Sequence, residues 1–84
     1  MKAPYQMDSA GNYHYKVNGK YHREDGPALE YYGGGGGHWY INGKLHRIDG
    51  PAVDYSFGHQ EYWLNGSRYS FEEWDRLRKL PWLL

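Results

Sequence analysis

Short stretches of alternating apolar and polar residues run through most of this chain, and three of them end at an Asn-Gly pair. Alternation with a period of two is typical of β-strands. Asn-Gly is the strongest short signal for a type I′ hairpin turn, because both central residues of that turn need a positive φ. The pattern therefore predicts aromatic strands before these turns and return strands after them. The aromatic strands are expected at Tyr13–Val17, His38–Ile41 and Gln60–Leu64, and the return strands at Lys20–Arg23, Lys44–Arg47 and Ser67–Tyr69.

The Asn-Gly turns belong to a sequence repeat. Residues 17–28 recur as residues 41–52, and a third, worn copy begins at Leu64. A fixed period of this length indicates supersecondary units that stack on one another. We expect a single domain over residues 1–84, with repeat units at approximately 4–26, 27–50 and 51–69. The repeated structural residues are Asn18, Gly19, His22, Asp25, Gly26 and Pro27, then Asn42, Gly43, His46, Asp49, Gly50 and Pro51, and finally Asn65 and Gly66.

A second bend is expected at Asp-Gly-Pro, which occupies 25–27 and 49–51. Glycine accepts unusual φ values and proline fixes its own. A further strand is expected after each bend, at Ala28–Tyr32 and Ala52–Ser56. The run Gly33–Gly37 is not expected inside a strand, because glycine has no side chain to pack there. It is interpreted either as a natural flexible hairpin tip or as an engineered loop replacement.

The C-terminal segment changes from a strand pattern to a helical one. Ser70 followed three residues later by a glutamate forms a capping box, and Phe71, Trp74 and Leu77 recur at helical spacing. We expect a capping helix over approximately 71–80 that packs this apolar side across the end of the sheet, as a repeat array needs. The predicted fold is mainly β: tandem antiparallel β-hairpin repeats in a meander, with one short C-terminal α-helix.

Composition and charge limit the classes of partner. Aromatic residues make up 19% of the chain and there are no cysteines, so disulfides and thiolate metal sites are excluded. The formal net charge is zero, which gives no basic excess to neutralise phosphates, and nucleic-acid binding is not expected. No apolar run in the sequence approaches the roughly 20 residues of a membrane helix. We expect a cytoplasmic protein that binds no membrane, located in the host cytoplasm if it is viral.

Each of the first two repeats carries a histidine that is a candidate for chemistry. Counting outwards from the Asn-Gly turns places His22 opposite Tyr15 and His46 opposite Trp39. Directly opposed side chains share a face of a hairpin, so each histidine is expected to stack on the aromatic ring of its own unit. A His-x-x-Asp spacing is a weak metal signal and no three-ligand cluster is visible. We expect neither a metal nor a cofactor.

The neighbouring arginines and aspartates allow two interpretations. Asp25 and Asp49 precede Gly-Pro, and an aspartate there commonly accepts a hydrogen bond from its own backbone two residues on and holds the turn. Arg23 and Arg47 either form ion pairs inside their repeats or line one face of the sheet, a repeat apart. In the second case they would suit an acidic protein patch or a phosphate.

Catalysis finds little support in the sequence. The chain has no cysteine nucleophile, no Gly-x-Ser-x-Gly elbow and no phosphate-binding glycine loop followed by a helix, which are the local signatures of common enzyme classes. A motif present in two copies also argues against one unique active site. We therefore expect a protein that is not an enzyme.

The repeated unit, aromatic-x-[Val/Ile/Leu]-Asn-Gly-Lys-x-His-Arg-x-Asp-Gly-Pro-Ala, resembles the MORN-variant repeat. The matching residues are 15–28 and 39–52, with a partial match at 62–66. Similar units occur in small proteins of bacteriophages and large DNA viruses, and related repeats occur in antitoxins. Ordinary MORN units carry Gly-x-Gly after the histidine, where this chain has Arg-x-Asp-Gly-Pro. The resemblance implies stacked hairpins and an interaction role, and it transfers no catalytic residues.

These observations favour a protein-binding module, in particular a phage-encoded inhibitor of a host defence protein. Tyrosine and tryptophan are preferred interface anchors, and the open N-terminal edge and apolar tail also favour a homodimer. The alternatives are a small-ligand or nucleotide-binding protein, which would sequester its ligand, and an antitoxin-like or structural repeat protein. The candidate binding residues are Arg23, Arg47, Tyr40, Trp63 and Trp82.

Overall fold

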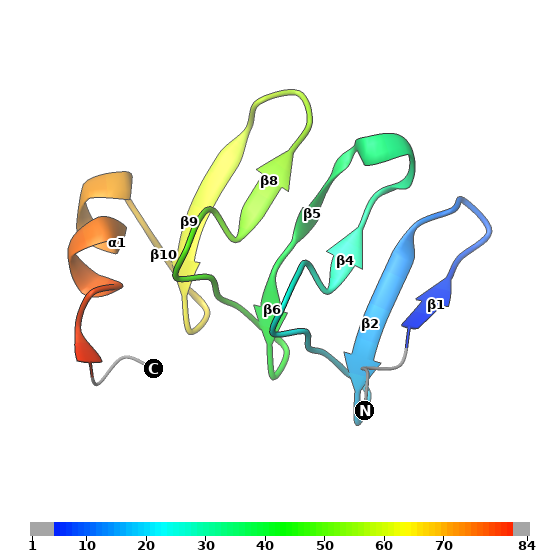
Figure 1. Cartoon of the computed structure of the whole chain (residues 1–84), viewed down its shortest axis with the longest axis horizontal. Coiled ribbons are helices and arrows are strands. Elements are labelled where there is room, and N and C mark those ends of the chain that lie inside the picture. The colour runs from blue at the N-terminus through cyan, green and yellow to red at the C-terminus, as the bar shows by residue number, and fades with distance from the viewer. Residues whose placement is uncertain (1–4, 82–84) are drawn as a thin grey trace.

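The chain folds into a row of antiparallel hairpins that ends in one short helix (Figure 1). The structure is a computed structural model and describes residues 5–81. The prediction of a mainly β fold with a short C-terminal helix is confirmed. The strands are β1 (Tyr5–Met7), β2 (Tyr13–Val17), β3 (Lys20–Tyr21), β4 (Leu29–Glu30), β5 (Gly36–His38), β6 (Tyr40–Ile41), β7 (Lys44–Leu45), β8 (Val53–Tyr55), β9 (Gln60–Leu64) and β10 (Ser67–Tyr69), and the helix is α1 (Phe71–Leu77).

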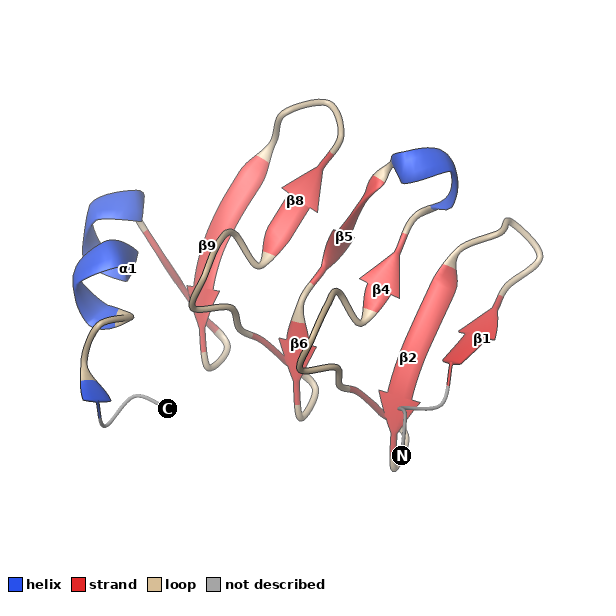
Figure 2. Cartoon of the chain, in the orientation of Figure 1, coloured by secondary structure: helices blue, strands red, loops and turns tan. Residues whose placement is uncertain are grey.

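The strands follow one another as a meander. The main sheet has the order β1-β2-β4-β5-β8-β9-β10, with β3 paired to β2, and β6 and β7 form a separate two-stranded ribbon. Figure 2 shows the larger hairpins side by side, with the small Asn-Gly hairpins all along the lower edge of the array. Every pairing is antiparallel, so consecutive units join through short turns and no crossover is needed.

The Asn-Gly turns have the geometry that the sequence predicts. The asparagines Asn18, Asn42 and Asn65 have φ values of 52°, 52° and 51°, and the glycines after them have φ values of 78°, 79° and 85°. Two successive positive φ values define the type I′ turn. The turn fixes the register of the hairpin: Lys16 lies opposite Tyr21, as expected. The local sequence therefore determines these corners.

The first two return strands are shorter than expected, because the chain leaves its own hairpin for the next repeat, whereas the third, β10, has the predicted bounds. The N–H of His22 donates to Tyr15 O in the same hairpin at 3.1 Å, but the N–H of Arg23 donates to Tyr40 O in the following repeat at 3.1 Å. His46 and Arg47 divide their N–H groups between two repeats in the same way. Strict alternation of side chains therefore ends before the histidine, and consecutive repeats are joined by backbone hydrogen bonds at this point.

The glycine run corrects the prediction that it lies outside any strand. Tyr32–Gly34 forms a short 3₁₀ turn, and the last two glycines belong to β5. Gly37 is paired with Glu30 on one side and Asp54 on the other, and a Cβ at this position would lie 2.7 Å from Leu29 O. Glycine is needed here because two backbones approach closely, a requirement that the local sequence does not reveal.

The sheet is a single thin layer with a very small core. The principal extents of the molecule are 39 × 31 × 17 Å. Neither side of the sheet is covered by a second sheet or a layer of helices along the described chain (Figure 1). The buried hydrophobic residues of this part are Ala28, Ala52, Val53, Leu64 and Trp74. Most aromatic side chains are consequently half-buried and take part of their packing from neighbouring rings.

The helix α1 closes the C-terminal end of the array. The hydroxyl of Ser70 accepts a hydrogen bond from Glu73 N at 3.2 Å, which is the predicted N-cap. The helix ends at Leu77 instead of residue 80. Its apolar side packs only in part as expected, because Trp74 is 3% exposed whereas Phe71 is 51% exposed. No helix among residues 5–81 is long and apolar enough to cross a membrane.

Candidate binding surfaces on the two faces of the sheet

The predicted binding residues separate onto opposite faces of the sheet. Tyr40 stacks on Tyr21 with ring centroids 5.0 Å apart. Trp63 occupies the same position in the next repeat, since Tyr40 follows Trp39 and Trp63 follows Tyr62. Consecutive side chains of a strand point to opposite faces. Arg23 and Arg47 lie on the opposite face from Tyr40 and Trp63. Trp82 lies outside the described residues. The first surface is called the aromatic face and consists of His14, Tyr21, Tyr31, His38, Tyr40 and Tyr55; the second is called the arginine face and consists of Tyr15, Arg23, Trp39 and Arg47.

The aromatic face is a continuous row of rings that extends from one repeat to the next. Ring centroids are 5.9 Å apart for His14 and Tyr21 and 6.2 Å apart for Tyr40 and His38. The row continues from His38 to Tyr55, an edge-to-face pair at 5.4 Å. Such pairs contribute about 0.5–1.5 kcal/mol each beyond the area that they bury. All five rings are half-buried, so they stabilise the sheet and remain partly available to a partner.

Tyr31, His38 and Tyr40 of the aromatic face are uncharged at neutral pH. Burial raises the pKa values of Tyr31 and Tyr40 and lowers the pKa of His38, because the charged form of each group is penalised by desolvation. Nε2 of His38 forms a hydrogen bond with Tyr55 Oη at 3.0 Å. The middle of the face is therefore neutral and presents ring faces and hydroxyl groups.

Two carboxylate–histidine pairs stand at the ends of the row. His14 Nε2 donates to Asp8 Oδ2 at 2.8 Å, and this hydrogen bond is the main reason why the pKa of Asp8 is lowered to about 2. His59 Nε2 donates to Glu61 Oε2 at 2.7 Å and Trp63 Nε1 donates to Glu61 Oε1 at 2.9 Å. Both contacts lower the pKa of Glu61. The indole N–H of Trp63, predicted as a binding group, is thus already used within the fold.

On the arginine face, arginines take the place that the sequence analysis gave to the histidines. The guanidinium of Arg23 lies 4.1 Å from the centre of the Tyr15 ring, and that of Arg47 lies 3.8 Å from the Trp39 ring. The prediction that each histidine stacks on the aromatic ring of its own unit is therefore wrong. A planar guanidinium stacks well on an aromatic face while its N–H groups stay free for hydrogen bonds.

The arginines form the ion pairs that the first of the two interpretations predicted. Arg23 Nε donates to Asp25 Oδ1 at 3.1 Å and Arg47 Nε donates to Asp49 Oδ1 at 2.9 Å. The aspartates thus accept from arginine side chains. The expected hydrogen bond from their own backbone two residues on cannot form, because that residue is a proline and has no N–H. A second N–H of each guanidinium binds the carbonyl of the proline in Asp-Gly-Pro, at 3.2 and 3.1 Å.

The glycine of Asp-Gly-Pro provides space for the guanidinium. Neither Gly26 nor Gly50 has a positive φ, so the acceptance of unusual φ values does not explain glycine at this bend. A Cβ on Gly26 would lie 2.7 Å from Arg23 Cζ, and a Cβ on Gly50 would lie 2.8 Å from Arg47 Cζ. The two repeats therefore share one structural unit, which consists of an aromatic ring, the arginine that stacks on it, the aspartate that pairs with the arginine and the glycine beneath the guanidinium.

The repeated histidines join one repeat to the next. His22 Nδ1 accepts a hydrogen bond from Asn42 N at 3.0 Å, and His46 Nδ1 accepts one from Asn65 N at 3.0 Å. An Nδ1 that accepts requires the neutral ring with its proton on Nε2. The pKa of His46 is lowered by burial, which also favours the neutral ring. Both histidines therefore act as scaffold, each bound to the Asn-Gly turn that follows.

Acidification is expected to weaken the fold through His46. Its pKa in the folded chain lies below the ordinary value of 6.5, so the stabilisation is fully present above about pH 6.5 and is lost as the pH falls through the folded pKa. The loss is on the order of 1 kcal/mol, the typical contribution of one hydrogen bond. Urea unfolding at pH 7.5 and 5.5 measures it. His46→Gln keeps an acceptor that cannot be protonated, and an equally large loss in this variant would contradict the assignment.

In the third repeat, the helix α1 takes the place that a stacked arginine has in the first two repeats. Ser70 occupies the sequence position that corresponds to Arg47, and the ring of Tyr62 is covered instead by Trp74, with centroids 4.7 Å apart. Trp74 Nε1 donates to Arg47 O at 2.8 Å. The helix thus completes the last unit of the arginine face, a role that the helical spacing of Trp74 indicated only in general terms.

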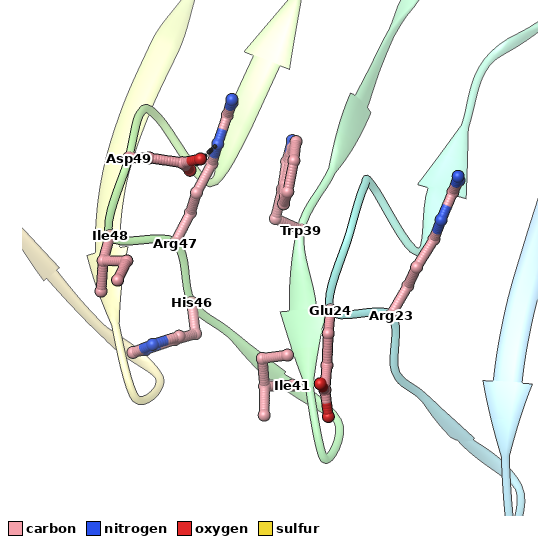
Figure 3. A pocket seen from close by; sticks show the side chains of 8 residues that line it. All are labelled: Arg23, Glu24, Trp39, Ile41, His46, Arg47, Ile48 and Asp49. Atoms are coloured by element: carbon pink, nitrogen blue, oxygen red, sulfur yellow. Dashed lines mark hydrogen bonds and ion pairs between the residues drawn. The ribbon is translucent and has the colours of Figure 1, made fainter. Parts of the chain in front are cut away.

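A partly enclosed groove of about 510 Å³ lies on the arginine face. Figure 3 shows the side chains of Arg23 and Arg47 extending toward one end of it, on either side of Trp39. Ile41 and Ile48 lie toward the other end. The local sequence pattern does not reveal this groove, because its walls come from two different repeats. The lining residues are Arg23, Glu24, Trp39, Ile41, His46, Arg47, Ile48 and Asp49.

Neither surface brings together a metal-binding cluster. Within residues 5–81, no group of three or more His, Cys, Asp or Glu side chains is arranged to hold a metal ion. Comparisons with known proteins found no matching family model, no matching curated protein and no matching solved structure. The resemblance to MORN-variant repeats therefore stays a prediction from the motif.

Proposed function

We propose that this chain is a non-enzymatic protein-binding module that acts by occupying a host protein, as a phage-encoded inhibitor would. The observation that carries the proposal is the aromatic face. It is a row of half-buried rings on a sheet that no second layer formed by residues 5–81 covers. A contiguous row of rings that stays partly accessible to solvent is a candidate interaction site.

The partner that fits this face is a protein surface with apolar side chains and exposed hydrogen-bond acceptors. Tyr40 and Tyr55 offer large ring areas with little rotational entropy to lose on binding. Phe57, which stacks on Tyr55 at 5.0 Å and is 77% exposed, extends the apolar area at the tip of one hairpin. The neutral middle of the face favours an uncharged contact region with the carboxylate–histidine pairs at its rim, as in typical interfaces.

An inhibitory role is consistent with the rigidity of this surface. Backbone hydrogen bonds and the His22 and His46 contacts connect each repeat to the next, so the rings are held in place before a partner binds. A preorganised surface loses less entropy on binding. The resemblance of the repeat to those of phage proteins is the reason for proposing a host protein, and a host defence protein in particular, as the target.

Affinity capture with two matched variants tests the proposal. Wild-type protein is expected to retain one host protein in stoichiometric amount from host-cell lysate, identified by mass spectrometry. Tyr40→Ala is expected to weaken that complex at least about tenfold, since buried aromatic anchors dominate interface energies. Tyr13→Ala removes a half-buried ring from the opposite face, where Tyr13 contacts Tyr5 at 5.6 Å, and is expected to leave binding unchanged. Absence of a stoichiometric partner, or the reverse response of the variants, contradicts the proposal.

A further inference from the structure

The two arginine sites of the arginine face differ in one contact. Arg23 Nη1 donates to Glu30 Oε1 at 2.7 Å, in addition to its bonds to the aspartate and to the proline carbonyl. Arg47 has the equivalent aspartate and proline contacts, but no second carboxylate among the described residues. Its guanidinium thus keeps hydrogen-bonding capacity that the first repeat satisfies internally.

The sequence explains why the second repeat lacks this carboxylate. Asp54 occupies the position that corresponds to Glu30, and its side chain is shorter by one methylene. Asp54 Oδ1 also accepts a hydrogen bond from Gln60 Nε2 at 3.2 Å. Glu30 has no such competitor, because its neighbour on the next strand is Gly37.

Two arginines and two carboxylates, Glu24 and Asp49, line the groove, and it is the state of the Arg47 guanidinium itself that favours an anion. The side chain is 20% exposed and its partner Asp49 is 73% exposed, so the ion pair is weakened by solvent. Stacking on Trp39 at 3.8 Å orients the guanidinium, and a half-buried, oriented guanidinium binds carboxylates and phosphates through two parallel hydrogen bonds. The position of Glu30 on Arg23 shows that this scaffold accommodates a carboxylate there.

We propose that the groove of the arginine face binds a small planar molecule that carries a carboxylate or phosphate. Its anionic group takes on Arg47 the role that Glu30 has on Arg23, and its ring lies against Trp39 and the isoleucine end of the groove. The volume of about 510 Å³ is within the usual range of small-molecule sites, and the lining combines Trp39, Ile41 and Ile48 with charged and polar side chains. This site is on the opposite side of the sheet from the aromatic face and does not depend on the proposed protein partner.

Binding of two probe anions tests the proposal. 2-Naphthoate represents an aromatic carboxylate and AMP a nucleoside phosphate. Acetate, which has the carboxylate without the ring, and adenosine, which has the ring without the phosphate, are their controls. Titrations followed by isothermal calorimetry and by the Trp39 indole N–H resonance, assigned with Trp39→Phe, are expected to show one site for at least one probe anion. The fragment of that probe, acetate for 2-naphthoate or adenosine for AMP, is expected to bind at least about tenfold more weakly. The tighter probe identifies the source of the anion, and no binding of either probe at about 10 mM, or binding that leaves the Trp39 resonance unmoved, overturns the proposal.

A variant that restores the internal carboxylate gives the sharper test. Asp54→Glu supplies the side chain that the first repeat has at this position, and we expect it to weaken probe binding at least about tenfold by occupying Arg47, with an unchanged or higher Tm. Asp54→Asn is the matched control: it removes a negative charge near the site without adding reach, and we expect binding as tight as that of the wild type or tighter. Equal binding by Asp54→Glu and the wild type overturns the proposal.

Discussion

Replacing Trp74 with alanine is expected to lower the free energy of unfolding by about 3–5 kcal/mol, the usual cost of removing a buried tryptophan. Trp74 is 3% exposed and is the one large aromatic residue in the buried core of the described chain. Its ring covers Tyr62 at 4.7 Å. Its indole N–H donates to Arg47 O at 2.8 Å, so the substitution also leaves a half-buried carbonyl without this partner. Urea unfolding followed by circular dichroism measures the loss.

Phe71 provides the matched control on the same helix. Its ring also contacts Tyr62, at 5.3 Å, but it is 51% exposed, and Phe71→Ala is expected to cost only about 1 kcal/mol. Trp74→Phe keeps a ring and removes the indole N–H, which separates packing from hydrogen bonding. Equal losses for Trp74→Ala and Phe71→Ala would show that the helix does not close the array through Trp74.

Gly36→Ala is expected to destabilise the protein by about 3 kcal/mol or more, as the sum of overpacking and backbone strain. A Cβ at this position would lie 2.0 Å from Asp54 O and 2.7 Å from Tyr55 Cα, so β5 and β8 would have to move apart. The residue also has a φ of +105°, which side chains other than glycine rarely adopt. Chemical denaturation and hydrogen exchange of the β5–β8 amides measure the effect.

Gly33 separates the two causes within the same glycine run. It has a φ of +70°, but a Cβ there would meet nothing within 4 Å. Gly33→Ala is therefore expected to cost only the strain of a positive φ, about 1–2 kcal/mol. If the two substitutions cost the same, the close approach of β5 and β8 at Gly36 is wrong.

The candidate binding surfaces show how far sequence reasoning reached. Strand alternation places Tyr40 and Trp63 on the opposite side from Trp39, because alternation depends only on neighbouring backbone dihedrals. The same reasoning failed for His46 and Arg47. At these residues the chain divides its hydrogen bonds between two repeats, and the guanidinium, not the imidazole, covers the ring. The groove between the arginines also depends on this division of the backbone hydrogen bonds between two repeats.

The sequence by itself determined the features that are set within a few residues. These are the type I′ corners at Asn-Gly, the hairpin register next to them and the N-cap at Ser70, since each depends on local φ preferences or a short side-chain contact. Only the tertiary structure decided what happens between repeats. Gly37 must be glycine because Leu29 O approaches it, and a Cβ on Gly50 would displace the guanidinium of Arg47. Such requirements come from residues that lie far apart in the sequence and that the fold brings together. A local sequence pattern contains no information about which residues will meet in this way.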